Sequence, residues 1–160
     1  AFAWLLDFVR ADGGTVVFSS AGEHDHVMTT VQAIRHFATF SLGAFLAAEG
    51  ANVARTLEFS SPIYRLELEM VCRLFAQDAR LYVDIMTATE ERRDAIGRLA
   101  ANAARLAELV EKNDRDALVA EFARSAKALG PEETGRALEE SARVIRALAR
   151  LIAGEETPER

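Results

Sequence analysis

The amino-acid sequence predicts an all-α protein, a bundle of about six helices. Half of its 160 residues are hydrophobic and only 3 are prolines, a composition typical of helical domains. After residue 22 the apolar residues recur at the spacing of one helix face. Residues that cap helices stand before the successive apolar runs, and glycine or asparagine follows several of them. These three observations agree on the fold class.

The first twenty residues are the exception. Residues 1–10 (AFAWLLDFVR) have helical apolar spacing, and Asp12-Gly13-Gly14 ends that helix. Thr15–Ser19 is rich in β-branched and aromatic residues, which predicts a strand. Because a lone strand has no sheet to join, we expect residues 1–20 to be the C-terminal remnant of an α/β domain. The chain also starts without methionine and within an element, so we expect a fragment.

Residues 21–160 are predicted to form one helical domain. Ser20 and Glu23 make a capping box for a long helix that Gly50 ends. Ser-Ser-Pro at residues 60–62 opens another helix, since proline is tolerated at the first helical position. Counting from the long one, the predicted helices span residues 22–49, 52–58, 60–77, 78–88, 90–112, 115–129 and 131–153. Their apolar stripes are wide for one small domain, and one of them is expected to be a subunit interface.

Several classes of function are excluded. A net charge of −6 gives no basic face for nucleic acid, and no apolar run reaches the ~20 residues that span a membrane. The single cysteine, Cys72, forms no internal disulfide and suits the cytoplasm, and we expect it to be a small core residue. His24 and His26, two residues apart on a helix, point to different faces, so no metal site is predicted.

The segment Ser60–Ile85 holds the strongest candidates for binding. Arg65 and Arg73 are eight residues apart, so their helical phase differs by roughly 80° and both can face one groove. Glu69 lies four residues from each, and Gln77 follows one turn after Arg73. The guanidinium groups either pair with Glu69 in an intrahelical ladder or bind a carboxylate ligand in two parallel hydrogen bonds. The spacing fits both alternatives.

Histidines and tyrosines give further candidates. His24 lies in the first turn of its helix, where the free N–H groups favour an anion; the alternative is a surface residue near the cap. His36, three turns later on an apolar helix, fits a core or interface histidine. Tyr64 and Tyr82 are either phenol donors at a pocket or ordinary half-buried aromatics.

Two blocks of sequence carry a family resemblance. HDHVMTTVQAIRHFATF at residues 24–40 and SSPIYRLELEMVCRLFAQDARLY at residues 60–82 resemble the C-terminal helical domain of prephenate dehydrogenase, the tyrosine-pathway enzyme. The form fused to chorismate mutase in enteric bacteria is the most similar. The resemblance covers most of the chain and weakens after about residue 90. It implies oxidative decarboxylation of prephenate to 4-hydroxyphenylpyruvate with NAD (or NADP), and a homodimer built by residues 21–160.

The resemblance also implies roles for single residues. Arg73 would bind the ring carboxylate of prephenate, with Arg65 as nearby support and Gln77 as a polar lining residue. His24 resembles a substrate-contacting histidine, and His36, with Tyr82, would serve feedback inhibition by L-tyrosine. The catalytic histidine of the family belongs to its nucleotide-binding domain. This chain has no G-x-G-x-x-G turn, so no catalytic residue is expected in it and the fragment alone should be inactive.

Two other functions fit the same residues. One is a non-catalytic helical dimerisation or regulatory module whose arginines face their own glutamates. The other is a helical mutase whose arginines clamp a dicarboxylate such as chorismate. Within the dehydrogenase interpretation, NAD or NADP, prephenate or arogenate, and the presence of a fused mutase domain stay open.

Overall fold

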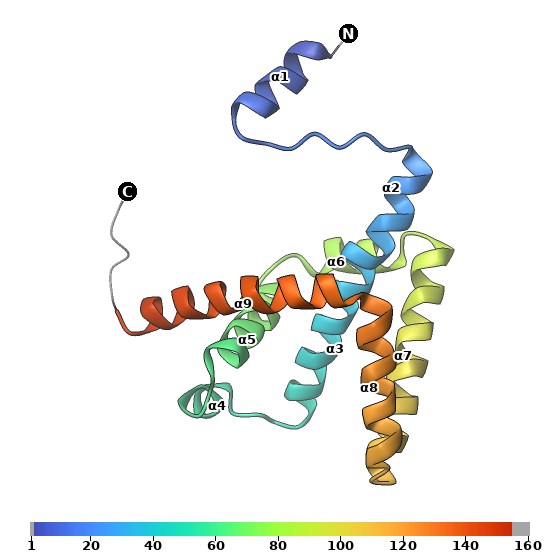
Figure 1. The fold of residues 1–160 in the computed structure, drawn as a ribbon, viewed down its shortest axis with the longest axis vertical. Helices are drawn as coiled ribbons and strands as arrows, with labels where there is room; N and C mark the ends of the chain where they lie inside the picture. The colour runs from blue at the N-terminus through green and yellow to red at the C-terminus, as the bar shows by residue number, and fades with distance from the viewer. Residues whose placement is uncertain (1, 155–160) are drawn as a thin grey trace.

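The computed structural model describes residues 2–154, and every regular element in that range is a helix (Figure 1). The order is α1 (Ala3–Ala11), α2 (Ala21–Met28), η1 (Thr29–Ile34), α3 (Arg35–Ala48), α4 (Val53–Glu58), α5 (Pro62–Phe75), α6 (Ala79–Thr87), α7 (Glu90–Glu111), α8 (Arg115–Leu129) and α9 (Pro131–Ile152). The all-α prediction is confirmed. None of these helices is long and apolar enough to cross a membrane.

The continuous helix formed by α2, η1 and α3 is the centre of the bundle. Its middle and C-terminal parts contact α5, α6 and α7. Helix α8 packs on α7, and α9 leads back across α5 (Figure 1). The arrangement brings α3, α5 and α6 together, and these are the helices that carry most of the candidate residues.

The predicted caps are confirmed by hydrogen bonds. The hydroxyl oxygen of Ser20 accepts from the Glu23 backbone N–H at 3.1 Å. Ser61, with Pro62 following at the first helical position, accepts from the Tyr64 N–H at 3.3 Å. Comparable side-chain caps open α4, α6, α7 and α8 (Asn52, Asp78, Thr89 and Asp114). The boundaries therefore follow from local signals in the sequence.

The long helix contains a π-helical segment, η1, where the sequence predicts an uninterrupted α-helix. Its i→i+5 hydrogen bonds accommodate about one extra residue. His24 and His36 would be about 120° apart around an uninterrupted α-helix, and the extra residue removes about 100° of that angle. The two histidines consequently lie on nearly the same face of the helix.

The strand predicted over Thr15–Ser19 is wrong for this chain. Residues 14–20 have no regular structure, and Val17 and Phe18 are 81% and 74% exposed. A strand needs a partner to accept and donate its hydrogen bonds, and the described part of the chain supplies none. Helix α1 and this extended segment project away from the bundle (Figure 1).

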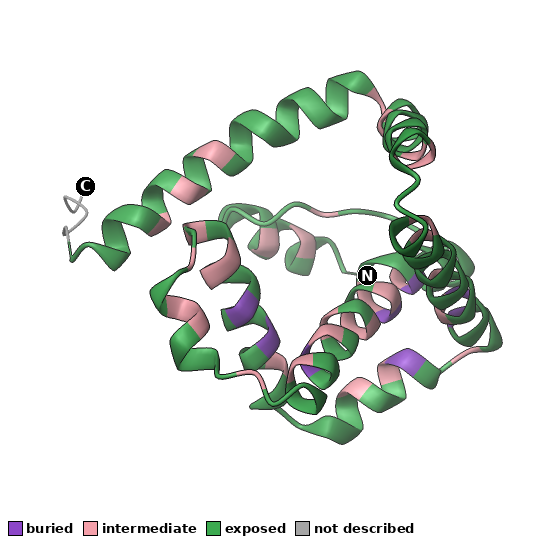
Figure 2. Ribbon diagram, turned by 90° about the horizontal axis from the view of Figure 1, so that it is seen from below, coloured by how far each residue is buried: buried purple, intermediate pink, exposed green. Residues whose placement is uncertain are grey.

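The core is small for a chain of this length. The buried apolar residues are few and lie where α5, α6 and α7 meet the central helix (Ala33, Leu68, Val71, Met86 and Ala95; Figure 2). Gly43 lets α5 come close to α3, because a Cβ there would lie 2.8 Å from Cγ1 of Val71. Large apolar side chains remain exposed on α1, α3, α5, α8 and α9. Exposed apolar faces of this kind are typical of surfaces that bind another protein, a ligand or a membrane.

Cys72 is not a core residue. It is exposed and lines a groove between α3 and α5 together with Gly43 and Phe75. The prediction failed because the apolar stripe of α5 is wider than the surface that α3 covers.

Candidate functional site

Four predicted site residues meet in one place. His36 of α3, Arg73 of α5, Gln77 after α5 and Tyr82 of α6 line a common pocket, and Arg35 borders it. The pocket measures about 30 Å³, whereas sites for small molecules typically measure 300–1,000 Å³. We therefore interpret it as one wall of a larger site.

A chain of hydrogen bonds fixes the polar side of this wall. The Tyr82 hydroxyl donates to Oε1 of Gln77 at 2.9 Å, and Nε2 of Gln77 donates to the Arg73 backbone carbonyl at 3.0 Å. The ring of His36 stands edge-on to that of Tyr82, with 4.7 Å between their centroids. Because the Gln77 amide is held at both ends, its orientation beside Arg73 is set before any ligand arrives.

Arg73 has no acidic partner within 4.0 Å in the described part of the chain. The intrahelical ladder is not formed, since Glu69 pairs with neither Arg65 nor Arg73. A guanidinium group that is left unpaired next to fixed polar groups can take a carboxylate in two parallel hydrogen bonds. This geometry favours the ligand-binding alternative.

His36 is biased towards its neutral form. Burial, followed by the positive charge of Arg35, lowers the pKa of His36 from its ordinary value of 6.5. An Nη1 of Arg35 lies 3.5 Å from Nδ1 of His36, and arginine can only donate, so Nδ1 is the acceptor. The positive charge at this wall therefore comes from Arg73 and Arg35.

An apolar pocket of about 120 Å³ adjoins the polar one and shares Gln77 and Tyr82 with it. Phe40 and Phe75 line it, with 5.7 Å between their ring centroids. A ligand with a ring and a carboxylate can place the ring against the phenylalanines and the carboxylate towards Arg73. The two pockets together suit a small amphipathic acid.

Two predicted substrate residues lie elsewhere. Arg65 is half-buried, and its Nη2 donates to the Leu57 carbonyl at 3.4 Å, which ties α5 to α4. His24 is on α2, exposed, with Nδ1 at 3.3 Å from Oδ1 of Asp25. Neither lines the pocket of Arg73, although His24 shares the helix face of His36 at a distance of roughly 18 Å along the axis.

Sequence reasoning missed Arg35 and Thr39 as pocket residues. The sequence did contain a signal for them, because Arg35 and Thr39 lie one and three residues from the candidate His36 on the same predicted helix. The direction in which these side chains point also depends on the π-helical turn that precedes them, and no sequence pattern predicts that turn.

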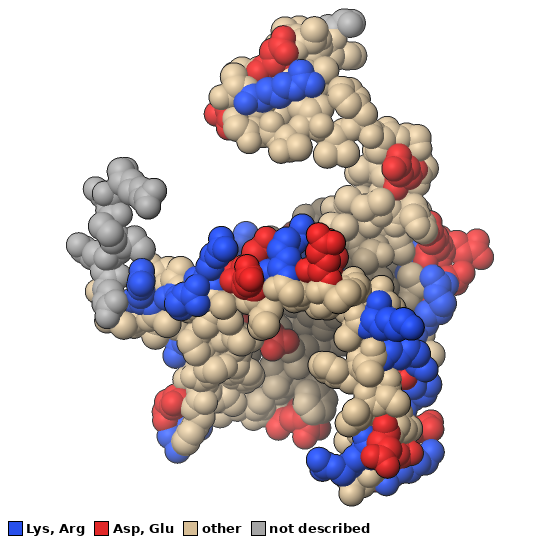
Figure 3. Space-filling view, viewed as in Figure 1, with Lys and Arg blue, Asp and Glu red and all other residues tan. Residues whose placement is uncertain are grey.

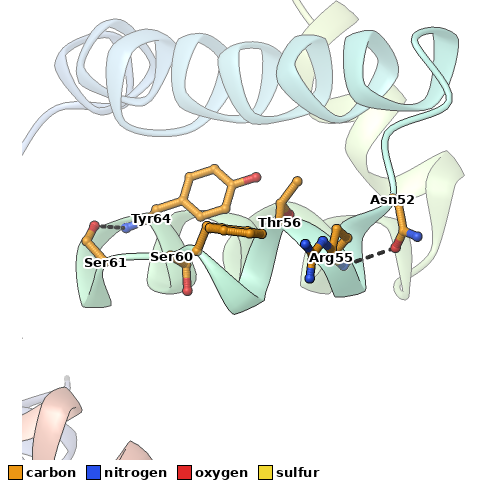
Figure 4. A pocket seen from close by; sticks show the side chains of 7 residues that line it. Asn52, Arg55, Thr56, Ser60, Ser61 and Tyr64 are labelled. Carbon is orange, nitrogen blue, oxygen red and sulfur yellow. Dashed lines mark hydrogen bonds between the residues drawn. The ribbon is translucent and has the colours of Figure 1, made fainter.

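A larger hollow of about 660 Å³ lies along α4 and the start of α5 (Figure 4). Tyr64, the other candidate tyrosine, lines this hollow, and within residues 2–154 its hydroxyl has no hydrogen-bond partner. The other polar side chains of the hollow already have partners. Asn52 and Ser61 cap helices, and Arg55 pairs with Glu58 and stacks over Phe59 at 4.5 Å. This hollow gives no comparable case for a ligand. In the described range, no three His, Cys, Asp or Glu side chains group to hold a metal ion.

Known proteins resemble this chain. Residues 20–124 match the family described as "Prephenate dehydrogenase, dimerization domain". The chain is 42% identical over 146 residues to a T-protein of Enterobacter agglomerans, and the aligned residues cover 91% of this chain and 39% of that protein. It is 43% identical over 121 residues to the T-protein of Haemophilus influenzae, with 76% of this chain and 32% of that protein aligned. It is 29% identical over 131 residues to a probable arogenate/prephenate dehydrogenase of Methanocaldococcus jannaschii, with 82% of this chain and 29% of that protein aligned. The chain thus spans 29 to 39% of the length of these relatives.

Proposed function

Because the chain belongs to the prephenate dehydrogenase dimerization-domain family, we propose that it is the substrate-binding and dimer-forming part of an NAD-dependent prephenate dehydrogenase. The proposed reaction moves a hydride from C4 of prephenate to the nicotinamide, and the ring carboxylate leaves as CO₂. NAD or NADP would be held mainly by a nucleotide-binding domain to which residues 1–20 belong. The exposed apolar residues of α1 are consistent with that second domain. The catalytic histidine would lie there too.

The observation that carries the proposal is the guanidinium of Arg73, which has no acidic partner within residues 2–154 and lines a polar pocket that adjoins an apolar one. In the proposed complex Arg73 binds the ring carboxylate, and Gln77, held by Tyr82, fixes the ligand beside it. His24 is proposed as a substrate contact on the sequence resemblance alone, since it lies roughly 18 Å from His36 along the helix axis and outside the pocket of Arg73. Arg65 supports α5 through Leu57.

Arg73 should act on binding more than on the chemical step. The carboxylate loses its charge as CO₂ departs, so its attraction to Arg73 is no stronger in the transition state than in the ground state. Interactions of this kind lower KM without raising kcat.

L-Tyrosine is the proposed feedback inhibitor. It shares a phenol ring and a carboxylate with the product of the reaction, so the same pair of pockets can receive it. His36 and Tyr82, which stand edge-on to each other, are the proposed sensors. A chorismate mutase would need both arginines at one dicarboxylate, and the engagement of Arg65 with Leu57 argues against that function.

The test is steady-state NADH formation from prephenate by the protein expressed with its complete reading frame. We expect Arg73→Ala to weaken prephenate binding by ~2–5 kcal/mol, which raises KM about 30-fold or more. The KM for NAD should stay unchanged. Arg65→Ala is the matched control, since it removes a guanidinium from the same helix outside the pocket. Equal effects of the two substitutions would overturn the site, and a wild type without prephenate-dependent NADH would overturn the reaction.

A further inference from the structure

Arg35 is a second cation at the wall that carries Arg73. It opens α3 directly after the π-helical turn, and its side chain lines the same small pocket as Arg73, Gln77 and Tyr82. Within residues 2–154 no acid lies within 4.0 Å of its guanidinium group. Its one side-chain hydrogen bond in that range joins Nη1 to Nδ1 of His36 and is long, at 3.5 Å. Most of its five N–H donors therefore have no partner in the described part of the chain.

The wall carries two positive charges and no negative one. None of the side chains that line the pocket within residues 2–154 is an Asp or a Glu. Burial, and then the charge of Arg35, holds the pKa of His36 below its ordinary value, so near pH 7 its ring offsets neither charge. Glu67, which borders the neighbouring pocket with Thr39, pairs with neither arginine among those residues. Two guanidinium groups at one wall repel each other, and a ligand with two negative charges offsets that repulsion.

The position of the two arginines distinguishes them from the other charged residues of the surface. The lack of an acidic partner is not distinctive by itself, since Arg146 on α9 also has none among residues 2–154. Along α9, basic and acidic side chains form one row on an open surface, where Arg136 pairs with Glu133 (Figure 3). Arg35 and Arg73 instead come from two helices, α3 and α5, to one pocket. One ligand can therefore contact both.

Prephenate, the proposed substrate, has two carboxylates at the same end of the molecule. One is attached to C1 of the ring, and the other ends the pyruvyl side chain that C1 also carries. The 4-hydroxyl group and the hydride that leaves C4 lie at the opposite end. With Arg73 on the ring carboxylate, the side-chain carboxylate needs a second cation close to the first. An arginine suits it, because the guanidinium group donates two parallel hydrogen bonds to a carboxylate.

We propose that Arg35 binds the side-chain carboxylate of prephenate while Arg73 binds the ring carboxylate. The inference rests on the proposed function and adds to it a substrate-binding residue on a second helix. Decarboxylation removes the ring carboxylate, whereas the side-chain carboxylate takes no part in the reaction and stays in the product, 4-hydroxyphenylpyruvate. Arg35 therefore binds substrate and product alike, and Arg73 binds the substrate alone.

The test is equilibrium binding of prephenate and of 4-hydroxyphenylpyruvate to the complete protein, by titration calorimetry without NAD so that no turnover occurs. Arg35→Ala should raise the Kd for both ligands about tenfold or more, since each loses a hydrogen-bonded charge pair. Arg73→Ala should raise the Kd for prephenate about 30-fold or more and that for 4-hydroxyphenylpyruvate by less than about twofold. The two substitutions thus differ in their effect on the product.

Two further variants separate this contact from general charge effects. Arg80 is exposed on α6, two residues before Tyr82, and lines neither the polar nor the apolar pocket. Arg80→Ala removes the same charge nearby and should leave both Kd values unchanged. Arg35→Lys keeps the charge but loses the two parallel hydrogen bonds, so its Kd values should fall between those of the wild type and Arg35→Ala. Because Arg35 is exposed, both of its variants should keep the urea midpoint of the wild type.

The outcomes distinguish this inference from the proposed function. A wild type that does not bind prephenate overturns both together. A wild type that binds prephenate, with Arg35→Ala no weaker than Arg80→Ala, overturns the role of Arg35 alone. A loss in Arg35→Ala that is confined to prephenate, or an equal loss of product binding in Arg73→Ala, overturns the division of the two carboxylates between the two arginines.

Discussion

Replacing Gly43 by alanine should destabilise the protein, although alanine favours helices more than glycine. The propensity difference alone would stabilise α3 by about 1 kcal/mol. Against this, the new Cβ would lie 2.8 Å from Cγ1 of Val71 and closer still to the ring of Phe75. Phe75 is half-exposed and can swing aside, whereas Val71 is only 4% exposed and cannot. Overpacking of this kind costs about 1–3 kcal/mol, and the buried contact places it in the upper part of that range.

The expected net loss is therefore about 1–2 kcal/mol of unfolding free energy, or a fall of roughly 2–8 °C in Tm for a domain of this size. Urea unfolding followed by circular dichroism measures it. Gly97→Ala is the matched control, because Gly97 is also helical and a Cβ added to it would have nothing within 4 Å. It should gain about 0.5–1 kcal/mol. A Gly43→Ala protein as stable as Gly97→Ala would refute the close approach of α3 and α5.

Two further changes test the polar groups of the fold. Arg92 is buried, and its Nη1 donates to the Ile85 carbonyl at 2.8 Å near the end of α6, so Arg92→Met should cost about 1–3 kcal/mol by leaving that carbonyl unpaired. The exposed Arg93, which donates to Thr87, is the control, and Arg93→Met should cost less in the same urea titration. The pKa of His36 is lowered in the folded protein, so the unfolded chain binds more protons just below pH 6.5, and stability should fall as the pH drops through that range. His36→Gln should remove this part of the pH dependence of the urea midpoint. If the variant and the wild type show the same pH dependence, His36 does not contribute to it.

The parts of the fold that follow from the sequence are those with local causes. Ser20, Ser61 and Asp78 cap helices because a side-chain oxygen reaches a backbone N–H two or three residues away. The π-helical turn at Thr29–Ile34 and the failed strand at Thr15–Ser19 depend on what packs against them, and a local pattern does not contain that information.

The candidate site likewise has residues whose positions follow from local spacing and residues whose positions depend on tertiary packing. Arg73 and Gln77 are one turn apart along the chain, and their proximity follows from spacing. Arg65 lies on the same helix as Arg73 and was expected to face the same groove, yet the contact of α4 with the start of α5 turns it to Leu57. The pairing of His36 with Tyr82 joins segments 46 residues apart in sequence, and helical periodicity alone does not predict it.

The measurement that tests the central claim most directly is equilibrium binding of prephenate to the complete protein by titration calorimetry, with wild type beside Arg73→Ala. If Arg73 holds the ring carboxylate, its loss should raise the Kd for prephenate about 30-fold or more and leave the Kd for NAD unchanged. An Arg73→Ala protein that binds prephenate as tightly as the wild type would contradict the account, because the guanidinium group on α5 would then have no part in binding the substrate.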